Sequence, residues 1–221
     1  MPINHAALVR RYRALLFDMD GTVLNSIAAA ERIWARWAAG HGLDVEAFLP
    51  TIHGARSVDT VAKLHLPGVD PVAEAAAITQ AEIDDVDGVV EIDGAAAFLS
   101  ALPRDRWAIV TSAPLALAKR RLEAAGIPAP AVLVTAEDVL NGKPSPEGYL
   151  LAAKKLGIDA VDCLIFEDAP VGIHAAESAG AAVMVVTATH SHPVDTSHPS
   201  IQGYRTLRVG IDKKGWIGFE S

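Results

Sequence analysis

Two patterns of apolar and polar residues divide this chain. Between residues 27 and 92 the apolar residues recur at helical spacing, which predicts helices at Ile27–Gly40, Ser57–Leu64 and Pro71–Asp85. From Gly94 onward, short apolar runs of strand length alternate with helical segments. A chain in which strands and helices alternate in this way typically forms a parallel sheet whose strands are connected by helices.

The alternating part of the chain predicts a regular order of elements. A short apolar run at 15–17, before the helical segment, is typical of a buried first strand. The later elements are the helix 95–102, the strand 107–110, the helix 114–125, the strand 132–134, the helix 146–156, the strand 163–166, the helix 171–179, the strand 182–186 and a hairpin-like pair within 206–219. The sequence therefore predicts an α/β fold. Residues 1–24 and 93–221 would form a Rossmann-like parallel sheet core, and residues 25–92 a helical domain inserted after the first strand.

Two carboxylates, Asp18 and Asp20, directly follow the first predicted strand. Open α/β sheets bind their ligands at the carboxyl ends of strands. Neighbouring carboxylates repel each other unless a cation neutralises them, and Mg²⁺ prefers such oxygen ligands. A calcium loop is excluded, because Val23 stands where that loop needs glycine and Ala29 where it needs glutamate. A Mg²⁺ site and a solvated turn both remain possible from this pair alone.

Other polar residues also follow predicted strands. Thr111 and Ser112 come after the strand 107–110, and Glu167 and Asp168 come after the strand 163–166. Lys143 lies in the loop that follows the strand 132–134. Because the carboxyl ends of parallel strands share one edge of the sheet, we expect all these groups to converge there. The convergence argues against a solvated turn, and the two later acids could bind a metal ion or support its ligands.

A phosphoryl group needs an in-line nucleophile, cations near its oxygens and hydrogen-bond donors around it. Asp18 could attack the phosphorus atom, while Mg²⁺ and Lys143 neutralise charge. The Thr111 hydroxyl and the backbone N–H of Ser112 could hold the transferring oxygens. Asp20 could protonate the leaving oxygen and then activate water. The predicted site therefore suits phosphoryl transfer.

A loop in the helical segment carries His53, Gly54 and Arg56. An imidazole and a guanidinium beside a flexible backbone position suit recognition of an anion or a hydroxyl group. An ordinary polar connection between helices explains the same residues equally well. The residues alone do not decide between the two interpretations.

Four segments together resemble the four motifs of the haloacid dehalogenase superfamily, in the branch with a helical cap inserted after the first motif. The segments are Asp18-Met19-Asp20-Gly21-Thr22, Thr111-Ser112, Lys143-Pro144 and Glu167-Asp168-Ala169-Pro170-Val171-Gly172. The resemblance covers nearly the whole chain from residue 15 to about 186.

The resemblance implies a role for each motif residue. Asp18 would form an aspartyl-phosphate, and Asp20 would act as acid and base and give Mg²⁺ its backbone carbonyl. Asp168 would complete the metal site. It stays open whether Thr111 or Ser112 supplies the hydroxyl that binds phosphate.

Three further segments, at 53–56, 107–112 and 166–170, resemble bacterial sugar and polyol phosphate phosphatases and fungal glycerol and deoxyglucose phosphate phosphatases. The cap loop of such enzymes selects the leaving group, which would make His53, Gly54 and Arg56 specificity residues. We therefore expect Mg²⁺-dependent hydrolysis of small sugar or polyol phosphate monoesters through an aspartyl-phosphate. We expect a monomer or a weak homodimer.

The main alternative is a phosphosugar mutase, which shares the cap and the motifs but must hold a second phosphate. Outside its amphipathic first helix, the cap offers Arg56 and Lys63 as the main candidate anchors, among many acids, so the sequence favours the phosphatase. A dehalogenase would have no use for Asp20 and the metal acids. A phosphosugar-binding module without activity would be expected to lack one of the motif residues, and none is lost.

Composition narrows the choice of partners. The 221 residues include 19 basic and 27 acidic ones, a formal net charge of −8, which disfavours nucleic acid and anionic membranes as partners. Cys163 is the only cysteine, so the chain forms no internal disulfide. No apolar run resembles a signal peptide or a membrane span. We expect a soluble cytoplasmic protein.

Overall fold

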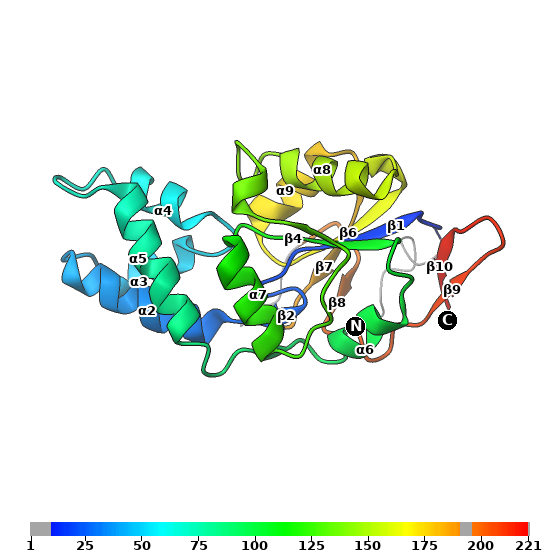
Figure 1. Ribbon diagram of the computed structural model, residues 1–221, viewed down its shortest axis with the longest axis horizontal. Helices are drawn as coiled ribbons and strands as arrows, with labels where there is room; N and C mark the ends of the chain where they lie inside the picture. Colours follow the sequence, from blue (N-terminus) through cyan, green and yellow to red (C-terminus); the bar gives the residue numbers. More distant parts are fainter. Residues whose placement is uncertain (1–9, 191–195, 221) are drawn as a thin grey trace.

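A six-stranded parallel sheet lies at the centre of the larger lobe in Figure 1. The computed structural model describes residues 10–190 and 196–220, so the first nine residues of the predicted core lie outside the described part. The strand order is β5–β4–β1–β6–β7–β8, and every neighbouring pair is parallel. The strands are β1 (Ala14–Phe17), β4 (Trp107–Val110), β5 (Val132–Val134), β6 (Cys163–Glu167), β7 (Ala182–Val186) and β8 (Ser200–Ile201). The predicted α/β fold is confirmed, and β8 adds an edge strand that the sequence did not predict.

Helices cover both faces of this sheet (Figure 1). Helices α6 (Ala95–Ala101) and α7 (Leu115–Ala124) pack on one face, and α8 (Glu147–Leu156) and α9 (Pro170–Ser178) pack on the other. Side chains of a strand alternate between the faces, so Leu15 and Phe17 join the first core while Ala14 and Leu16 join the second. All four are fully buried. This double burial explains why the strands are continuous apolar runs in the sequence.

A helical lobe lies to one side of the sheet, at the left of Figure 1. It contains α2 (Ile27–Gly40), α3 (Val45–Phe48), the short 3₁₀ helix η1 (Leu49–Thr51), α4 (Ser57–Lys63) and α5 (Pro71–Asp84). The predicted helices agree with α2, α4 and α5 to within a residue, whereas α3 and η1 were not predicted. Trp34, Phe48, Val61 and Ile78 belong to a separate apolar cluster inside this lobe.

Two short strands connect the helical lobe to the sheet. The strand β2 (Leu24–Asn25) leads into the lobe and pairs antiparallel with β3 (Val90–Glu91), which leads out. The entry and exit of the insertion are therefore held side by side. We call residues 25–92 the cap and the remaining residues the core, a division that stays a prediction.

The end of the described chain forms an antiparallel hairpin of β9 (Val209–Ile211) and β10 (Ile217–Phe219). The hairpin agrees with the pattern seen in the sequence, and Tyr12 pairs with Ile217, which ties it to the segment before β1. Within the described residues, no helix is long and apolar enough to cross a membrane.

Candidate active site

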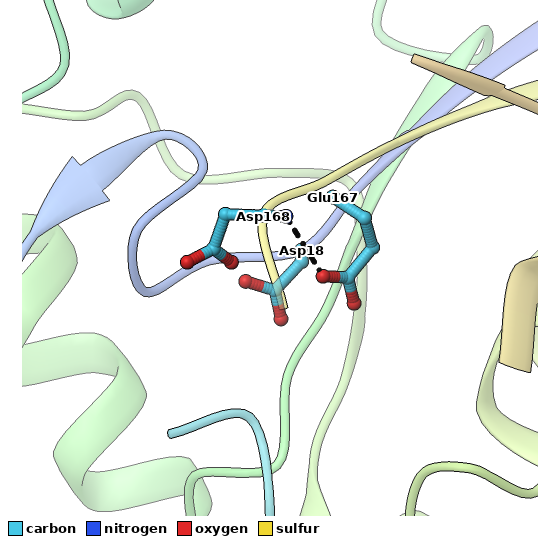
Figure 2. Close-up of side chains that lie close together, drawn as sticks. All are labelled: Asp18, Glu167 and Asp168. Carbon is cyan, nitrogen blue, oxygen red and sulfur yellow. Dashed lines mark hydrogen bonds between the residues drawn. The ribbon is translucent and has the colours of Figure 1, made fainter. Parts of the chain in front are cut away.

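Three carboxylates meet where β1 and β6 end (Figure 2). The register pairs Phe17 with Phe166, so Asp18 and Glu167 leave adjacent strands side by side. Carboxylate oxygens of Asp18, Glu167 and Asp168 lie within 4.8 Å of one another, and all three residues are almost completely buried. Buried acids held this close create a site for a hard cation.

The loop after β1 leaves room for Asp168 because residue 21 is glycine. Gly21 has a φ of +87°, and a Cβ at this position would overlap the Asp168 carboxylate. The neighbouring Thr22 hydroxyl donates a hydrogen bond to Asp168 Oδ1, 3.3 Å away. The Asp-x-Asp-Gly-Thr segment therefore shapes its loop around an acid from another strand.

Lys143 connects two of the carboxylates. Its Nζ donates to Asp18 Oδ1 at 2.5 Å and to Glu167 Oε1 at 2.6 Å. The Tyr149 hydroxyl on α8 donates to the same Glu167 oxygen at 2.7 Å. The other oxygen, Oε2, accepts the backbone N–H groups of Asp168 and Ala169. Both oxygens of Glu167 are thus engaged, which suits a residue that positions Lys143; its predicted role as a direct metal ligand remains untested.

The first turn of α9 approaches Glu167 closely. A Cβ at Gly172 would overlap the Glu167 carboxylate. The glycine in the Glu-Asp-Ala-Pro-x-Gly segment is thus needed for this close approach, because any larger residue would displace the carboxylate that holds Lys143. Tyr149 was not predicted, and its only sequence signal is its place in the helix after Lys143.

Burial and mutual repulsion change the acidity of the cluster. Burial raises the pKa of Asp18 to about 7, and Lys143 only partly opposes this effect. The pKa of Asp168 is also raised, by burial first and then by the charges of Asp18 and Glu167. Burial lowers the pKa of Lys143, but the two carboxylates it contacts outweigh this effect and raise it. The lysine therefore stays charged, and a further cation is needed to keep both aspartates ionised.

Asp20 turns away from the carboxylate cluster. Its Oδ1 accepts hydrogen bonds from the Ser26 hydroxyl at 2.5 Å and from Arg121 Nη1 at 2.9 Å. Arg121, on α7 of the core, also donates from Nη2 to Glu82 on α5 of the cap, 3.1 Å away. The carboxylate of Asp20 is thus held by Ser26 and Arg121, and it is not part of the cluster of Asp18, Glu167 and Asp168.

The sequence analysis missed Arg121 and Glu82. A signal was present, because each lies on an apolar helix face. Arg121 follows the buried Leu117 by four positions, and Glu82 follows the buried Ile78 by four. A charged residue at such a position is either paired or functional.

The hydroxyls of Thr111 and Ser112 have different partners. The Ser112 hydroxyl donates to the carbonyl oxygen of Gly54 in the cap, 2.9 Å away. The Thr111 hydroxyl accepts the backbone N–H of Ala113 at 3.0 Å, and it donates to no partner in the described part of the chain. Ser112 therefore ties the core to the cap, while Thr111 keeps its hydrogen available.

The structure separates the three predicted specificity residues. His53 and Gly54 line the pocket that holds Asp18, and His53 Nε2 lies 3.4 Å from Glu31 Oε1. Arg56 lines a neighbouring hollow instead. It pairs with Asp59 at 2.6 Å and donates to the carbonyl oxygen of Leu140 in the core at 3.1 Å. Arg56 therefore joins cap to core beside the pocket.

The pocket lies between the two lobes. Asp18, Asp20 and Asp168 line it from the core, and Trp34 and Glu82 line it from the cap. A parallel α/β sheet that brings a buried aspartate, a buried lysine and an acidic cluster together under a helical lobe is typical of capped phosphoryl-transfer hydrolases.

Comparison with known proteins agrees with this class. The family model for haloacid dehalogenase-like hydrolases matches residues 12–180, so the chain belongs to this family. It is 41% identical to hexitol phosphatase A of Escherichia coli over 84% of this chain and 86% of that protein. It is 33% identical to glycerol-1-phosphate phosphohydrolase 1 of Saccharomyces cerevisiae over 86% of this chain and 80% of that protein.

The fold comparison gives the same result. The structure of CbbY from Rhodobacter sphaeroides in complex with phosphate superposes with a TM-score of 0.72 at 21% identity, covering 87% of this chain and 95% of that one. This likeness concerns the fold alone. Together the comparisons confirm the predicted family and, with it, a phosphoric monoester hydrolase.

Proposed function

We propose that this protein is a Mg²⁺-dependent phosphatase that hydrolyses small sugar or polyol phosphate monoesters through an aspartyl-phosphate. The observation that carries the proposal is the contact of Asp18 with Lys143 beside Asp168, inside a pocket closed by a cap. The names of the relatives, a hexitol phosphatase and a glycerol-1-phosphate phosphohydrolase, support the substrate class.

The residues present fit a hard divalent cation. Carboxylates of Asp18 and Asp168 would hold Mg²⁺ together with the backbone carbonyl of Asp20, a donor set made only of oxygen. Burial raises the pKa of both carboxyl groups, so a bound cation would relieve their repulsion. When bound, Mg²⁺ supplies positive charge beside the phosphoryl oxygens.

The side chains can carry out the reaction in two steps. An oxygen of Asp18 attacks phosphorus while the bond between phosphorus and the ester oxygen breaks. The ester oxygen leaves with a proton from Asp20. Water then attacks the aspartyl-phosphate and gives a proton to Asp20, which releases phosphate and restores Asp18. Lys143 balances the negative charge of the phosphoryl group, and the free hydrogen of Thr111 favours this residue as the hydroxyl donor.

The decisive test replaces the nucleophile. Asp18→Asn should abolish phosphate release from a panel of hexose, hexitol, pentose and glycerol phosphates assayed with Mg²⁺, because an amide does not form the acyl phosphate. Asp105→Asn is the matched control, since its side chain is 76% exposed in a loop. Circular dichroism should show both variants folded. Turnover retained by Asp18→Asn, with Asp105→Asn like the parent, would overturn the proposal.

The mutase alternative finds less support in the cap. Arg56 pairs with Asp59 outside the pocket, and Lys63 is exposed on the surface. Neither side chain is placed to hold a second phosphate group against the Asp18 site. Formation of an isomerised sugar phosphate instead of free phosphate in the same assay would favour the mutase.

A further inference from the structure

A buried ion pair joins the two lobes beside the predicted acid and base. Arg121 of the core and Glu82 of the cap are 3.1 Å apart, and their side chains are only 7% and 5% exposed. Burying a pair of charges costs free energy that apolar residues of the same size would not cost. A pair at this place is therefore better explained by a function in the pocket than by stability.

The pair lies beside Asp20, the residue proposed to protonate the leaving alcohol. In the proposed mechanism Asp20 protonates the ester oxygen, so the leaving alcohol would extend from that oxygen along the side of the pocket next to Asp20. Arg121 contacts Asp20 directly, and Glu82 follows it on the cap side. Both residues line the same pocket as Asp18.

The charges at this end of the pocket select for a neutral, hydroxylated group. Asp20 and Glu82 both contact the guanidinium of Arg121 and balance its charge, so this end of the pocket offers no surplus positive charge to an added anion. A carboxylate accepts hydrogen bonds from hydroxyl groups, and a guanidinium donates to them. Trp34 lines the same pocket, and its side chain hydrogen-bonds to Glu82, which favours the charged form of this acid.

We propose that Glu82 and Arg121 form a specificity site that binds hydroxyl groups of the leaving alcohol, so that phosphate monoesters of uncharged polyols are preferred. This assignment rests on the proposed phosphatase function. It differs from selection by the cap loop, because one of the two residues belongs to the core and the other to α5.

Three substrates separate this role from an effect on catalysis. Glycerol 1-phosphate carries free hydroxyls, n-propyl phosphate has the same chain without them, and p-nitrophenyl phosphate needs little help from an acid. In Glu82→Gln, kcat/KM for glycerol 1-phosphate should fall about ten- to hundredfold, because the substrate hydroxyl loses its hydrogen bond to a charged group. The value for n-propyl phosphate should change less than about threefold.

The controls address folding and position. Glu74→Gln makes the same change on the same helix, where Glu74 accepts a hydrogen bond from Trp37 inside the cap, and it should leave all three values unchanged. Arg121→Lys keeps the charge but loses the fork that reaches both Asp20 and Glu82, so it should lower kcat/KM for n-propyl phosphate as well, and for glycerol 1-phosphate by a larger factor. Thermal unfolding monitors the fold of each variant.

Each outcome decides one hypothesis. Equal losses for glycerol and n-propyl phosphates, with p-nitrophenyl phosphate spared, would mean that Glu82 acts through Asp20 and would overturn the specificity site. If the parent released phosphate from no ester, the proposed function would fail instead. Calorimetry would then measure the affinity of Asp18→Asn for glycerol 1-phosphate and for n-propyl phosphate. Equal affinities would contradict the specificity site.

Discussion

Asp18 combines two demands that conflict in the absence of a cation. In the proposed mechanism it must be ionised to attack phosphorus, yet burial raises its pKa to about 7 even with Lys143 in contact. Its neighbour Asp168 shares the same difficulty. If Mg²⁺ binds here as proposed, it should displace a proton near neutral pH.

This exchange predicts how Mg²⁺ binding depends on pH. Asp18 must lose its proton to bind the cation, so the affinity should rise with pH and fall by up to about tenfold per unit below pH 7. Isothermal titration calorimetry at pH 6, 7 and 8 measures it, and the heat should report release of a proton at pH 6. An affinity that is the same at all three values would contradict the prediction.

The same shift affects stability without metal. Consider a carboxyl group whose pKa is higher in the folded than in the unfolded protein. Its contribution to stability is fully present at pH values below the unfolded-state pKa, and it is lost as the pH rises through the folded-state pKa. For Asp18 that range runs from about 4 to about 7. Metal-free protein should therefore lose stability across it, and Mg²⁺ should restore stability at pH 8.

At the scale of elements, the start of α9 determines whether Lys143 is correctly held. The helix begins beside Glu167, and the absence of a side chain at Gly172 lets the two approach. The strand β6 and the helix α9 thus position the lysine of a loop that follows β5. One glycine connects the packing of three elements to the charge at Asp18.

Gly172→Ala tests this connection. The added methyl group should displace the Glu167 carboxylate, lower kcat by at least about tenfold through loss of the hydrogen bonds around Lys143, and destabilise the fold by about 1–3 kcal/mol. Phosphate release and urea unfolding measure the two effects.

Gly40→Ala provides the matched control. Gly40 is the last residue of α2, and nothing lies within 4 Å of an added Cβ there. This variant should keep full activity and be at least as stable as the parent, because alanine favours helices. Full activity in Gly172→Ala would show that Glu167 is not needed to hold the lysine.

At the scale of the whole molecule, the cap contacts the core on two sides of the pocket. The Arg121–Glu82 pair joins them on one side, and Arg56 with Leu140 and Ser112 with Gly54 join them on the other. A substrate that enters between the lobes must fit the pocket formed by both. The contact of Arg56 with the core should therefore affect kcat/KM for every substrate by the same factor.

Arg56→Ala distinguishes this contact from direct binding of substrate. Losing the hydrogen bond to the Leu140 carbonyl should lower kcat/KM by about two- to tenfold, because one hydrogen bond contributes about that much. The factor should be the same for glycerol 1-phosphate and n-propyl phosphate. Arg32→Ala is the control, because Arg32 pairs with Asp85 within the cap. A loss confined to one substrate would instead support the predicted role of Arg56 in specificity.

The sequence alone determined the fold class, the positions of most elements and the residues at the carboxyl edge of the sheet. It did so because β1, β4 and β6 are buried on both faces and are followed at once by polar residues, a pattern fixed by local chain chemistry. The helices of the cap were equally visible from their apolar spacing.

Only the tertiary structure decided which of these polar groups touch. Helix packing brings Tyr149 to Glu167, and the seating of the cap brings Glu82 to Arg121 while it turns Arg56 away from the pocket. Such contacts join residues far apart in the chain and depend on how whole elements dock. Spacing along the sequence does not predict that docking. The one signal present is a charged residue at an apolar position of a helix.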